Sequence, residues 1–259
     1  MANARRKYLE AAYEILLEEG IEGISSRKIA SRAGTSSTAL YRHFDNVEDL
    51  VAAASLHFLH DYTVDARTLS EVDLNPLELN LQLWECFAYY SFHEAPIFEN
   101  LFFGQGRQGS ISQASEIYYE EFPEELEAMP SFMESMLTGS SLANRDFVLL
   151  SRAASIGMLT SENAEYLCDI DTYLYRGMLA MIRDTYDRPD VARRATHDFL
   201  QLVIKGYQGR LEPGYSILVV EPPVSEQGAQ SQGGVINSYR VKFIPFDRAG
   251  NAGGTERLA

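Results

Sequence analysis

The chain has 259 residues, and 37 acidic side chains against 22 basic ones give it a formal net charge of -15. Hydrophobic residues make up 46% and aromatic residues 11% of the composition, which excludes a disordered polyelectrolyte and allows one or two domains with substantial cores. The overall acidity by itself argues against a partner rich in phosphate groups. Two cysteines, Cys86 and Cys168, are too few for a disulfide framework and fit a reducing compartment.

Neither a targeting segment nor a membrane span is predicted. The basic start, Met1 to Lys7, runs into a mixed amphipathic segment that lacks the apolar region of a signal peptide. Elsewhere, no uncharged apolar run approaches the length needed to cross a bilayer. We therefore expect a cytoplasmic protein without membrane contact.

The first 50 residues show the signals of short helices separated by tight turns. Apolar residues spaced three and four apart predict a helix over residues 4–19. Ser26 is expected to cap a short helix that runs through Ala33, and Gly34 then permits a sharp turn. A second short helix, capped by Ser36 or Ser37, completes the pattern.

A longer helix is predicted from Val47 to about residue 68, capped by Asp45 or Asn46. The next helix is expected over residues 77–94 and is closed by Pro96. Beyond it, glycines predict a loop, and two prolines divide the following region into short helices.

Two strong helices are expected next, over residues 161–186 with Ser161 as N-cap, and from about residue 189 to 211. From Glu212 the chain becomes rich in glycine and proline, and 215–220 and 235–246 read as strands of a hairpin, with disorder equally compatible. The sequence thus predicts an all-α fold in three parts. These are a three-helix helix-turn-helix domain (1–47), a larger helical domain (48–211) and an irregular or β-hairpin tail (212–259).

The local charge of the N-terminal region differs from that of the whole chain. Between Arg5 and Arg42, seven basic and five acidic side chains give +2, so the rest of the chain carries -17. The basic residues Arg5 to Lys7, Arg27, Lys28 and Arg42 lie at predicted helix starts or near the tight turn, where a duplex could approach. Two short helices joined by a glycine turn are typical of the helix-turn-helix, whose second helix enters the major groove.

The segment of residues 20–49, GIEGISSRKIASRAGTSSTALYRHFDNVED, resembles the DNA-binding domain of the tetracycline-repressor (TetR/AcrR) family of transcriptional regulators. The likeness covers roughly residues 4–60. It depends on Ile29-Ala30, the Ala33-Gly34 turn, and the run from Leu40 to Phe44 followed by an acidic helix start.

The resemblance implies a set of DNA-binding residues. Ser26 and Arg27 would reach a phosphate or a base edge, Ser37 and Thr38 would face bases, and Tyr41 and His43 would bind phosphates. The full predicted set is Ser26, Arg27, Lys28, Ser36, Ser37, Thr38, Tyr41, Arg42 and His43. One departure is Val47, which stands where the family often has a phosphate-binding lysine.

The resemblance also implies a homodimer that binds a palindromic operator in double-stranded DNA, and a helical domain that binds a small-molecule effector. On this basis we expect a repressor that leaves its operator when the effector binds. The alternative is a DNA-binding regulator controlled by a protein partner or by its own C-terminal tail.

Aromatic residues concentrate in the middle of the chain and suggest an apolar effector pocket, with ordinary core packing as the alternative. The predicted pocket residues are Trp84, Phe87, Tyr90, Phe103, Tyr118, Tyr119 and Phe122. Because the acids Glu85, Glu94 and Glu116 lie nearby in sequence, we expect a lipophilic or cationic effector.

Other motifs do not predict chemistry. Gly104-x-Gly106-x-x-Gly109 matches the dinucleotide fingerprint, but no βαβ unit surrounds it. His57, His60 and Asp61 have helical spacing that could hold a metal, although surface histidines explain them more simply. No nucleophile, base and orienting group occur together, so we expect no enzyme, no catalytic residue, no metal and no cofactor.

Overall fold

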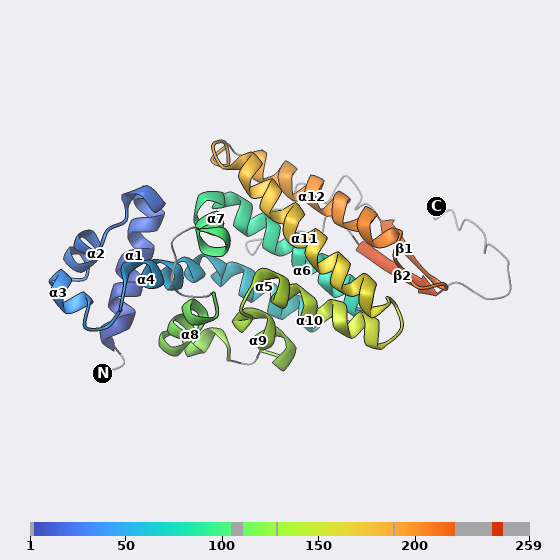
Figure 1. The fold of residues 1–259 in the computed structure, drawn as a ribbon, viewed down its shortest axis with the longest axis horizontal. Helices are drawn as coiled ribbons and strands as arrows, with labels where there is room; N and C mark the ends of the chain where they lie inside the picture. Colours follow the sequence, from blue (N-terminus) through green and yellow to red (C-terminus); the bar gives the residue numbers. More distant parts are fainter. Residues whose placement is uncertain (1–2, 105–110, 128, 189, 221–239, 246–259) are drawn as a thin grey trace.

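A computed structural model describes residues 3–104, 111–127, 129–188, 190–220 and 240–245. The architecture is helical, with the N-terminal helices at one end of an elongated molecule and two strands near the other end (Figure 1). The α-helices are α1 (Asn3–Glu19), α2 (Ser26–Arg32), α3 (Ser37–Leu40), α4 (Val47–Ser55), α5 (His60–Ser70), α6 (Pro76–His93), α7 (Ala95–Phe103), α8 (Ile111–Glu121), α9 (Ser131–Thr138), α10 (Leu142–Ser155), α11 (Ser161–Ile182) and α12 (Val191–Gln208). Short 3-10 segments are η1 (Ile21–Gly23), η2 (Leu56–Leu59) and η3 (Pro123–Glu125), and the strands are β1 (Tyr215–Val220) and β2 (Arg240–Pro245).

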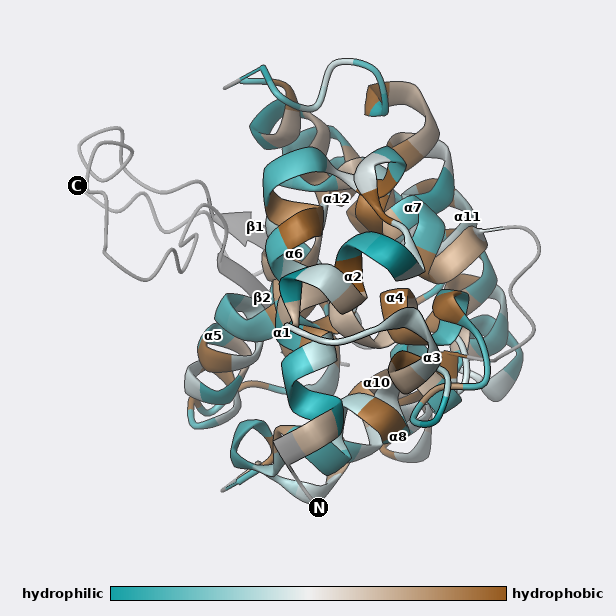
Figure 2. Ribbon diagram, turned by 90° about the vertical axis from the view of Figure 1, so that its left-hand side faces the viewer, coloured by the Kyte–Doolittle hydropathy of each residue, from teal (hydrophilic) through white to brown (hydrophobic). Residues whose placement is uncertain are grey.

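Helices α1, α2 and α3 form an N-terminal cluster that packs on α4. Tyr8 and Ile15 of α1 are buried with Ile29 of α2 and with Leu40 and Phe44 at the end of α3. Figure 2 shows this end of the molecule, where hydrophilic and hydrophobic residues alternate along α1 and α2. The expected helices of residues 4–19 and 26–33 are confirmed to within a residue at each end.

Two predicted caps were wrong by one position. The N-cap of α2 is Ser25, not Ser26, because Ser25 has extended backbone angles and its Oγ accepts the Lys28 N–H at 3.3 Å. Likewise, Thr160 rather than Ser161 caps α11, and its Oγ1 accepts the Asn163 N–H at 3.0 Å.

The single helix predicted from Val47 to about residue 68 is interrupted. It begins as predicted with Asn46 as N-cap, whose Oδ1 accepts the Asp49 N–H at 2.7 Å. Ser55 then donates its buried hydroxyl to the Val51 carbonyl at 2.8 Å, and the chain tightens into η2 before α5 begins. A serine that bonds back to its own helix in this way commonly distorts it.

Pro96 both follows one helix and opens the next. Helix α7 over residues 95–103 is not predicted from the sequence, and it has the proline in its first turn, where the missing N–H costs nothing. Of the glycine motif that follows, Gly106 and Gly109 lie outside the described residues.

Helices α6, α10, α11 and α12 pack together as the main body (Figure 1). Aromatic rings fill its centre: Tyr175 of α11 stacks on Phe92 of α6 at 5.5 Å between centroids, and Trp84 meets Phe199 of α12 edge-on at 5.3 Å. Such contacts add to the large area that aromatic side chains bury.

A buried polar network links these four helices through their centre. Asn80 of α6 donates to Asp146 of α10 at 2.7 Å, and the Tyr207 hydroxyl of α12 lies 2.7 Å from both Asn80 Oδ1 and Asp171 Oδ2 of α11. Burial raises the pKa of both carboxyl groups, and the proximity of Asp146 raises the pKa of Asp171 further.

The tail contains the hairpin that was one of the two predicted alternatives. Strand β1 pairs antiparallel with β2, in a register that sets Ile217 opposite Phe243, and the pair contacts α6 and α12. The other residues assigned to the second strand, 235–239 and 246, lie outside the described part of the chain. The boundary predicted at residue 47 stays a prediction, and α4 begins there and continues into the main body.

Candidate nucleic-acid interface and ligand cavity

Helices α2 and α3 are held in a fixed relation by the turn between them. Gly34 has a φ of +69°, a left-handed conformation that disfavours residues with a Cβ atom. The Thr35 N–H then donates to the Ala30 carbonyl at 2.8 Å, and Ser36 caps α3 by accepting the Ala39 N–H at 3.2 Å. The geometry is that of a helix-turn-helix with a very short second helix.

The predicted DNA-binding residues cluster around this turn and the two helix starts. Most of their side chains are exposed, namely Arg27, Lys28, Ser36, Thr38, Tyr41, Arg42 and His43, whereas Ser26 and Ser37 are half-buried. Tyr41 is 49% exposed although it is a large aromatic residue, and the rings of His43 and Tyr8 are 5.7 Å apart. The arrangement offers hydroxyl, imidazole and guanidinium groups on one end of the molecule.

The cations of α2 are not equally available. Lys28 Nζ lies 2.5 Å from Glu19 of α1, and Arg32 makes two bonds of 2.7 and 3.0 Å with Glu18. By contrast, Arg27 and Arg42 form no ion pair within the described ranges. They are therefore the two cations of this turn that are free to meet a phosphate or a base.

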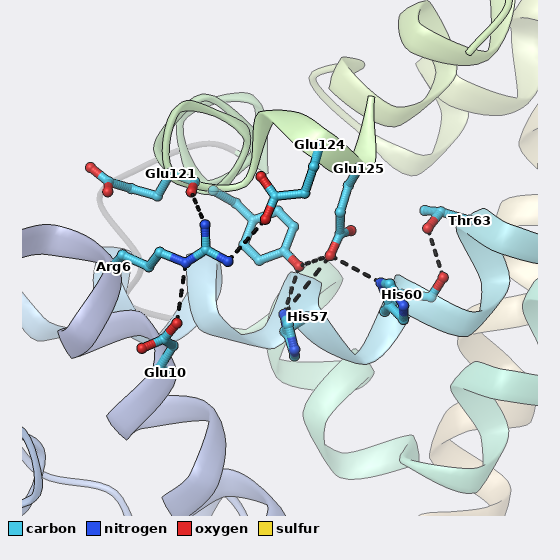
Figure 3. A network of polar contacts seen from close by, with 9 residues as sticks. Arg6, Glu10, His57, His60, Thr63, Glu121, Glu124 and Glu125 are labelled. Carbon is cyan, nitrogen blue, oxygen red and sulfur yellow. Dashed lines mark hydrogen bonds and ion pairs between the residues drawn. The ribbon is translucent and has the colours of Figure 1, made fainter. Parts of the chain in front are cut away.

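Arg5 and Arg6 were predicted to lie where a DNA duplex could approach, but both are paired with residues of the helical body. Arg5 pairs with Glu120 of α8 at 2.8 Å. Figure 3 shows Arg6, which bonds Glu124 of η3 at 2.9 Å and the Glu121 carbonyl at 3.1 Å. We call these contacts the α1–α8 latch. They were missed because the acidic partners are more than a hundred residues away in sequence.

A second polar network lies beside the latch (Figure 3). Buried Tyr118 donates to Glu125 at 2.7 Å and lies 2.8 Å from Nδ1 of His57, while His60 Nδ1 is 3.1 Å from the same carboxylate. Burial lowers the pKa of His57 and raises that of Tyr118, so both groups favour their neutral forms. In the described part of the chain, no group of three or more His, Cys, Asp or Glu could hold a metal.

A cavity of about 50 Å³ lies inside the main body, between α5, α6, α7, α9 and α10. Its apolar walls are Leu59, Leu83, Trp84, Phe87, Phe102, Met136, Leu137 and Leu142. Its polar groups are Tyr62, Asn80, Arg145 and Asp146. A largely apolar lining with a few convergent polar groups is the usual composition of a small-molecule site.

Only part of the predicted pocket lines this cavity. Trp84 and Phe87 do so, whereas Tyr118 and Phe122 border a smaller cavity of about 10 Å³ beside α1. The remaining predicted residues border neither cavity. Tyr90 donates to Asp65 at 2.7 Å, Phe103 lies under Arg176, and Tyr119 is buried.

The polar residues of the cavity lining are not among those predicted from the sequence. Asn80, Arg145 and Asp146 are buried polar residues on helices whose inward positions are otherwise apolar. That pattern is a signal in itself, because a buried polar group is retained only where it has partners or a function.

Comparisons with known proteins agree with this geometry. The model of the family "Bacterial regulatory proteins, tetR family" matches residues 9–54. The HTH-type transcriptional regulator PksA of Bacillus subtilis (strain 168) is 30% identical over 112 residues, which are 37% of this chain and 55% of PksA. Tetracycline repressor protein class D of Escherichia coli is 37% identical over 65 residues, 24% of this chain and 30% of the repressor. The chain thus matches about half or less of the length of these curated relatives.

Similarity of fold extends much further along the chain. FadR of Thermus thermophilus, a TetR family repressor, has a TM-score of 0.53 at 17% identity, covering 85% of this chain and 98% of FadR. RolR has a TM-score of 0.51 at 14% identity, covering 79% of this chain and 91% of RolR. The helix-turn-helix at the N-terminus and the family match lead to one conclusion: residues 9–54 match the tetR family of bacterial regulatory proteins, and the helical body behind them shares the fold of FadR and RolR.

Proposed function

We propose that this chain is a ligand-responsive transcriptional repressor that binds a palindromic operator as a homodimer. The observation that carries the proposal is the turn between α2 and α3, which presents Arg27, Thr38, Tyr41 and Arg42 outward at one end of the molecule. Hydroxyl and guanidinium groups of this kind read base edges and position the phosphate backbone. That the predicted DNA-binding residues contact DNA is part of this proposal.

Ligand response is supported by the cavity and by its connection to the N-terminal cluster. Leu59 of η2 lines the cavity, and η2 continues directly from α4, on which α1 packs. A change at the cavity wall can therefore move the N-terminal cluster through α4, with the α1–α8 latch as a second connection. The structures of FadR and RolR were determined with lauroyl-CoA and resorcinol, respectively.

Dimer formation is supported by an apolar face on α11. Tyr166, Tyr173 and Met181 recur seven and eight residues apart, so they lie on one side of the helix, and they are 44%, 66% and 78% exposed. Leu167, on another side of the same helix, is buried in the core. A second copy of the chain covering this face would hold two N-terminal clusters at a fixed half-site distance.

The test is a gel shift of the purified protein on DNA flanking its own gene, repeated at several salt concentrations. We expect a retarded species at low salt whose affinity falls as salt rises. Arg42→Ala should weaken binding and reduce the salt slope by about one per N-terminal cluster. Arg193→Ala removes an exposed cation from α12 and is the matched control, with binding unchanged. No retarded species at low salt would overturn the proposal.

A second mode of control is favoured by the hairpin. Because β1 and β2 contact α6 and α12, the tail has a direct route to the cavity wall, part of which α6 forms, and to α12. Under this alternative a protein partner that engages the tail, rather than a small molecule, would release DNA. Deleting residues 212–259 separates the two modes, since an unchanged effector response and unchanged dimerisation would exclude control by the tail.

A further inference from the structure

Arg145 stands out among the residues that line the cavity. It lies on α10 and is only 7% exposed, yet its hydrogen bonds go to neutral groups, the Gly139 carbonyl at 3.2 Å and the Ser115 hydroxyl at 2.8 Å. Within the described residues it forms no ion pair with any carboxylate. Its Nη1 donates to no protein acceptor in that same part of the chain.

A guanidinium in this position remains charged. Burial lowers the pKa of Arg145 to about 10, which still leaves the group protonated at neutral pH. A buried charge without a counterion is costly, and proteins normally pair it or place it where a charged ligand binds. The face of Phe102, 5.9 Å from the guanidinium carbon, gives only partial compensation.

Asp146 shares the cavity but is not this counterion. Its Oδ1 already accepts bonds from Asn80 and from the Trp84 indole, both at 2.7 Å. Burial raises the pKa of Asp146, and the two carboxyl groups of Asp146 and Asp171 lie close enough that charge on one disfavours charge on the other. The lining therefore has an excess of positive charge.

The sign of this charge bears on the effector expected from sequence. The expectation of a cation came from Glu85, Glu94 and Glu116, and none of the three lines the cavity. The titratable groups that do line it are Tyr62, Arg145 and Asp146.

We infer that the cavity binds a small organic acid, whose carboxylate pairs with Arg145 and whose aromatic or alkyl part lies against Trp84, Phe87 and Phe102. The planar guanidinium suits a carboxylate because it can donate two parallel N–H bonds. The inference rests on the proposed function, since it names the chemical class of the effector at the same cavity.

The chain provides its own probe for this test. Trp84 is the single tryptophan of the sequence, and its ring forms part of the cavity wall. Quenching of its fluorescence can be titrated with benzoate, phenylacetate, hexanoate and octanoate, each beside its uncharged primary amide, and with benzylamine as a cation. We expect at least one acid of the set to bind, and to bind at least tenfold more tightly than its amide, with benzylamine weaker still.

Two variants test whether the preference for acids over amides depends on Arg145. Arg145→Gln keeps an amide that can bond Ser115 and Gly139 but removes the charge, so the preference for acid over amide should be lost. Arg152→Gln removes an exposed cation from the same helix and should leave that preference intact. Equal binding of acids and amides, no binding by any acid, or an unchanged preference in Arg145→Gln would overturn the inference. If that variant does not fold by circular dichroism, the comparison on the wild-type protein decides.

The measurements distinguish failure of this inference from failure of the proposed function. Binding of acids is read from Trp84 without DNA, and operator binding is read by gel shift without acid. If acids bind through Arg145 and no DNA is retarded, the inference stands and the proposed function fails. If DNA is retarded and the acids show no advantage over the amides, the inference alone fails.

Discussion

Arg27 and Arg32 lie on the same short helix but in different surroundings. Arg32 is bonded to Glu14 and Glu18 of α1, whereas the exposed Arg27 has no ion pair in the described chain. An arginine held by two carboxylates would have to break those bonds to reach DNA. The structure therefore separates a cation that stabilises the N-terminal cluster from one that can recognise a base.

Arg27→Ala should relax specificity at one operator position, with a loss of discrimination of about 1–3 kcal/mol at that base pair. The measurement is competition gel shift against operators with single base changes. Arg32→Ala is the control and should lower thermal stability without changing the ranking of operators. A uniform loss of affinity across all sequences in Arg27→Ala would contradict the assignment.

Tyr41→Phe removes a hydroxyl that we assign to a phosphate, so all operator sequences should lose affinity equally, by about 1 kcal/mol. The fold should not respond, because Tyr41 is 49% exposed and its hydroxyl is on the surface. Fluorescence anisotropy on the operator and on scrambled DNA measures both losses. A loss confined to the operator would instead indicate a base contact.

At the scale of elements, the turn between α2 and α3 depends on the conformation of Gly34. A Cβ atom at this position would meet no neighbour within 4 Å, so the cost of a substitution comes from the left-handed backbone alone. Gly34→Ala should lower stability by about 1 kcal/mol, or about 2–4 °C in melting temperature. Gly209→Ala is the matched control, since Gly209 has an ordinary φ of -84° and equally open space. Equal melting temperatures of the two variants would contradict this account.

The buried network across α6, α10, α11 and α12 predicts a dependence of stability on pH. Because the pKa of Asp171 is raised in the folded protein, its contribution is complete below the ordinary pKa of aspartate and is lost as pH rises through the folded-state value. Wild-type stability should thus decline as pH rises above the ordinary pKa of aspartate, by up to about 1.4 kcal/mol per pH unit for one proton. Asp171→Asn should flatten this decline, as measured by chemical unfolding across the pH range.

The exposed Asp169→Asn on the same helix serves as the control and should keep the wild-type decline. The groups facing Asp171 are Asp146 of α10 and Tyr207 of α12, and Cys168 is close by on α11. Parallel curves for wild type and Asp171→Asn would show that this carboxyl does not titrate in the range.

The elements near the N-terminus could be predicted because their signals are local. Ser36, Gly34 and Asn46 each fix a cap or a turn through partners within five residues. The cavity depends instead on pairs such as Asn80 with Asp146 and Tyr207 with Asn80, separated by 66 and 127 residues. Periodicity in the sequence does not show which helices meet. The concentration of aromatic residues was therefore predicted, whereas the polar lining of the cavity was not.

At the scale of the whole molecule, the exposed face of α11 brings together three large hydrophobic side chains, Tyr166, Tyr173 and Met181. Replacing Tyr173 and Met181 by Glu should convert the proposed dimer to a monomer, because burying two carboxylates against a second copy is unfavourable. Light scattering after gel filtration gives the mass directly. DNA affinity should fall with it, since the two N-terminal clusters would no longer be linked.

Leu17→Glu is the control for this substitution. Leu17 is 60% exposed on α1, away from α11, so the same change from an apolar residue to an acid should leave the mass unaltered. A dimeric mass for the Tyr173/Met181 double variant would place the interface elsewhere.

The α1–α8 latch has a consequence for exchanging parts between regulators. Arg6 bonds to Glu124 and the Glu121 carbonyl and lies 4.3 Å from the Phe122 ring, so the start of the DNA-binding unit is fitted to one particular helical body. A chimaera that receives a foreign N-terminal domain without cations at positions 5 and 6 should still bind that domain's operator. Its response to effector should be blunted until both arginines are restored, because specificity for DNA transfers with the domain, whereas its control depends on the junction.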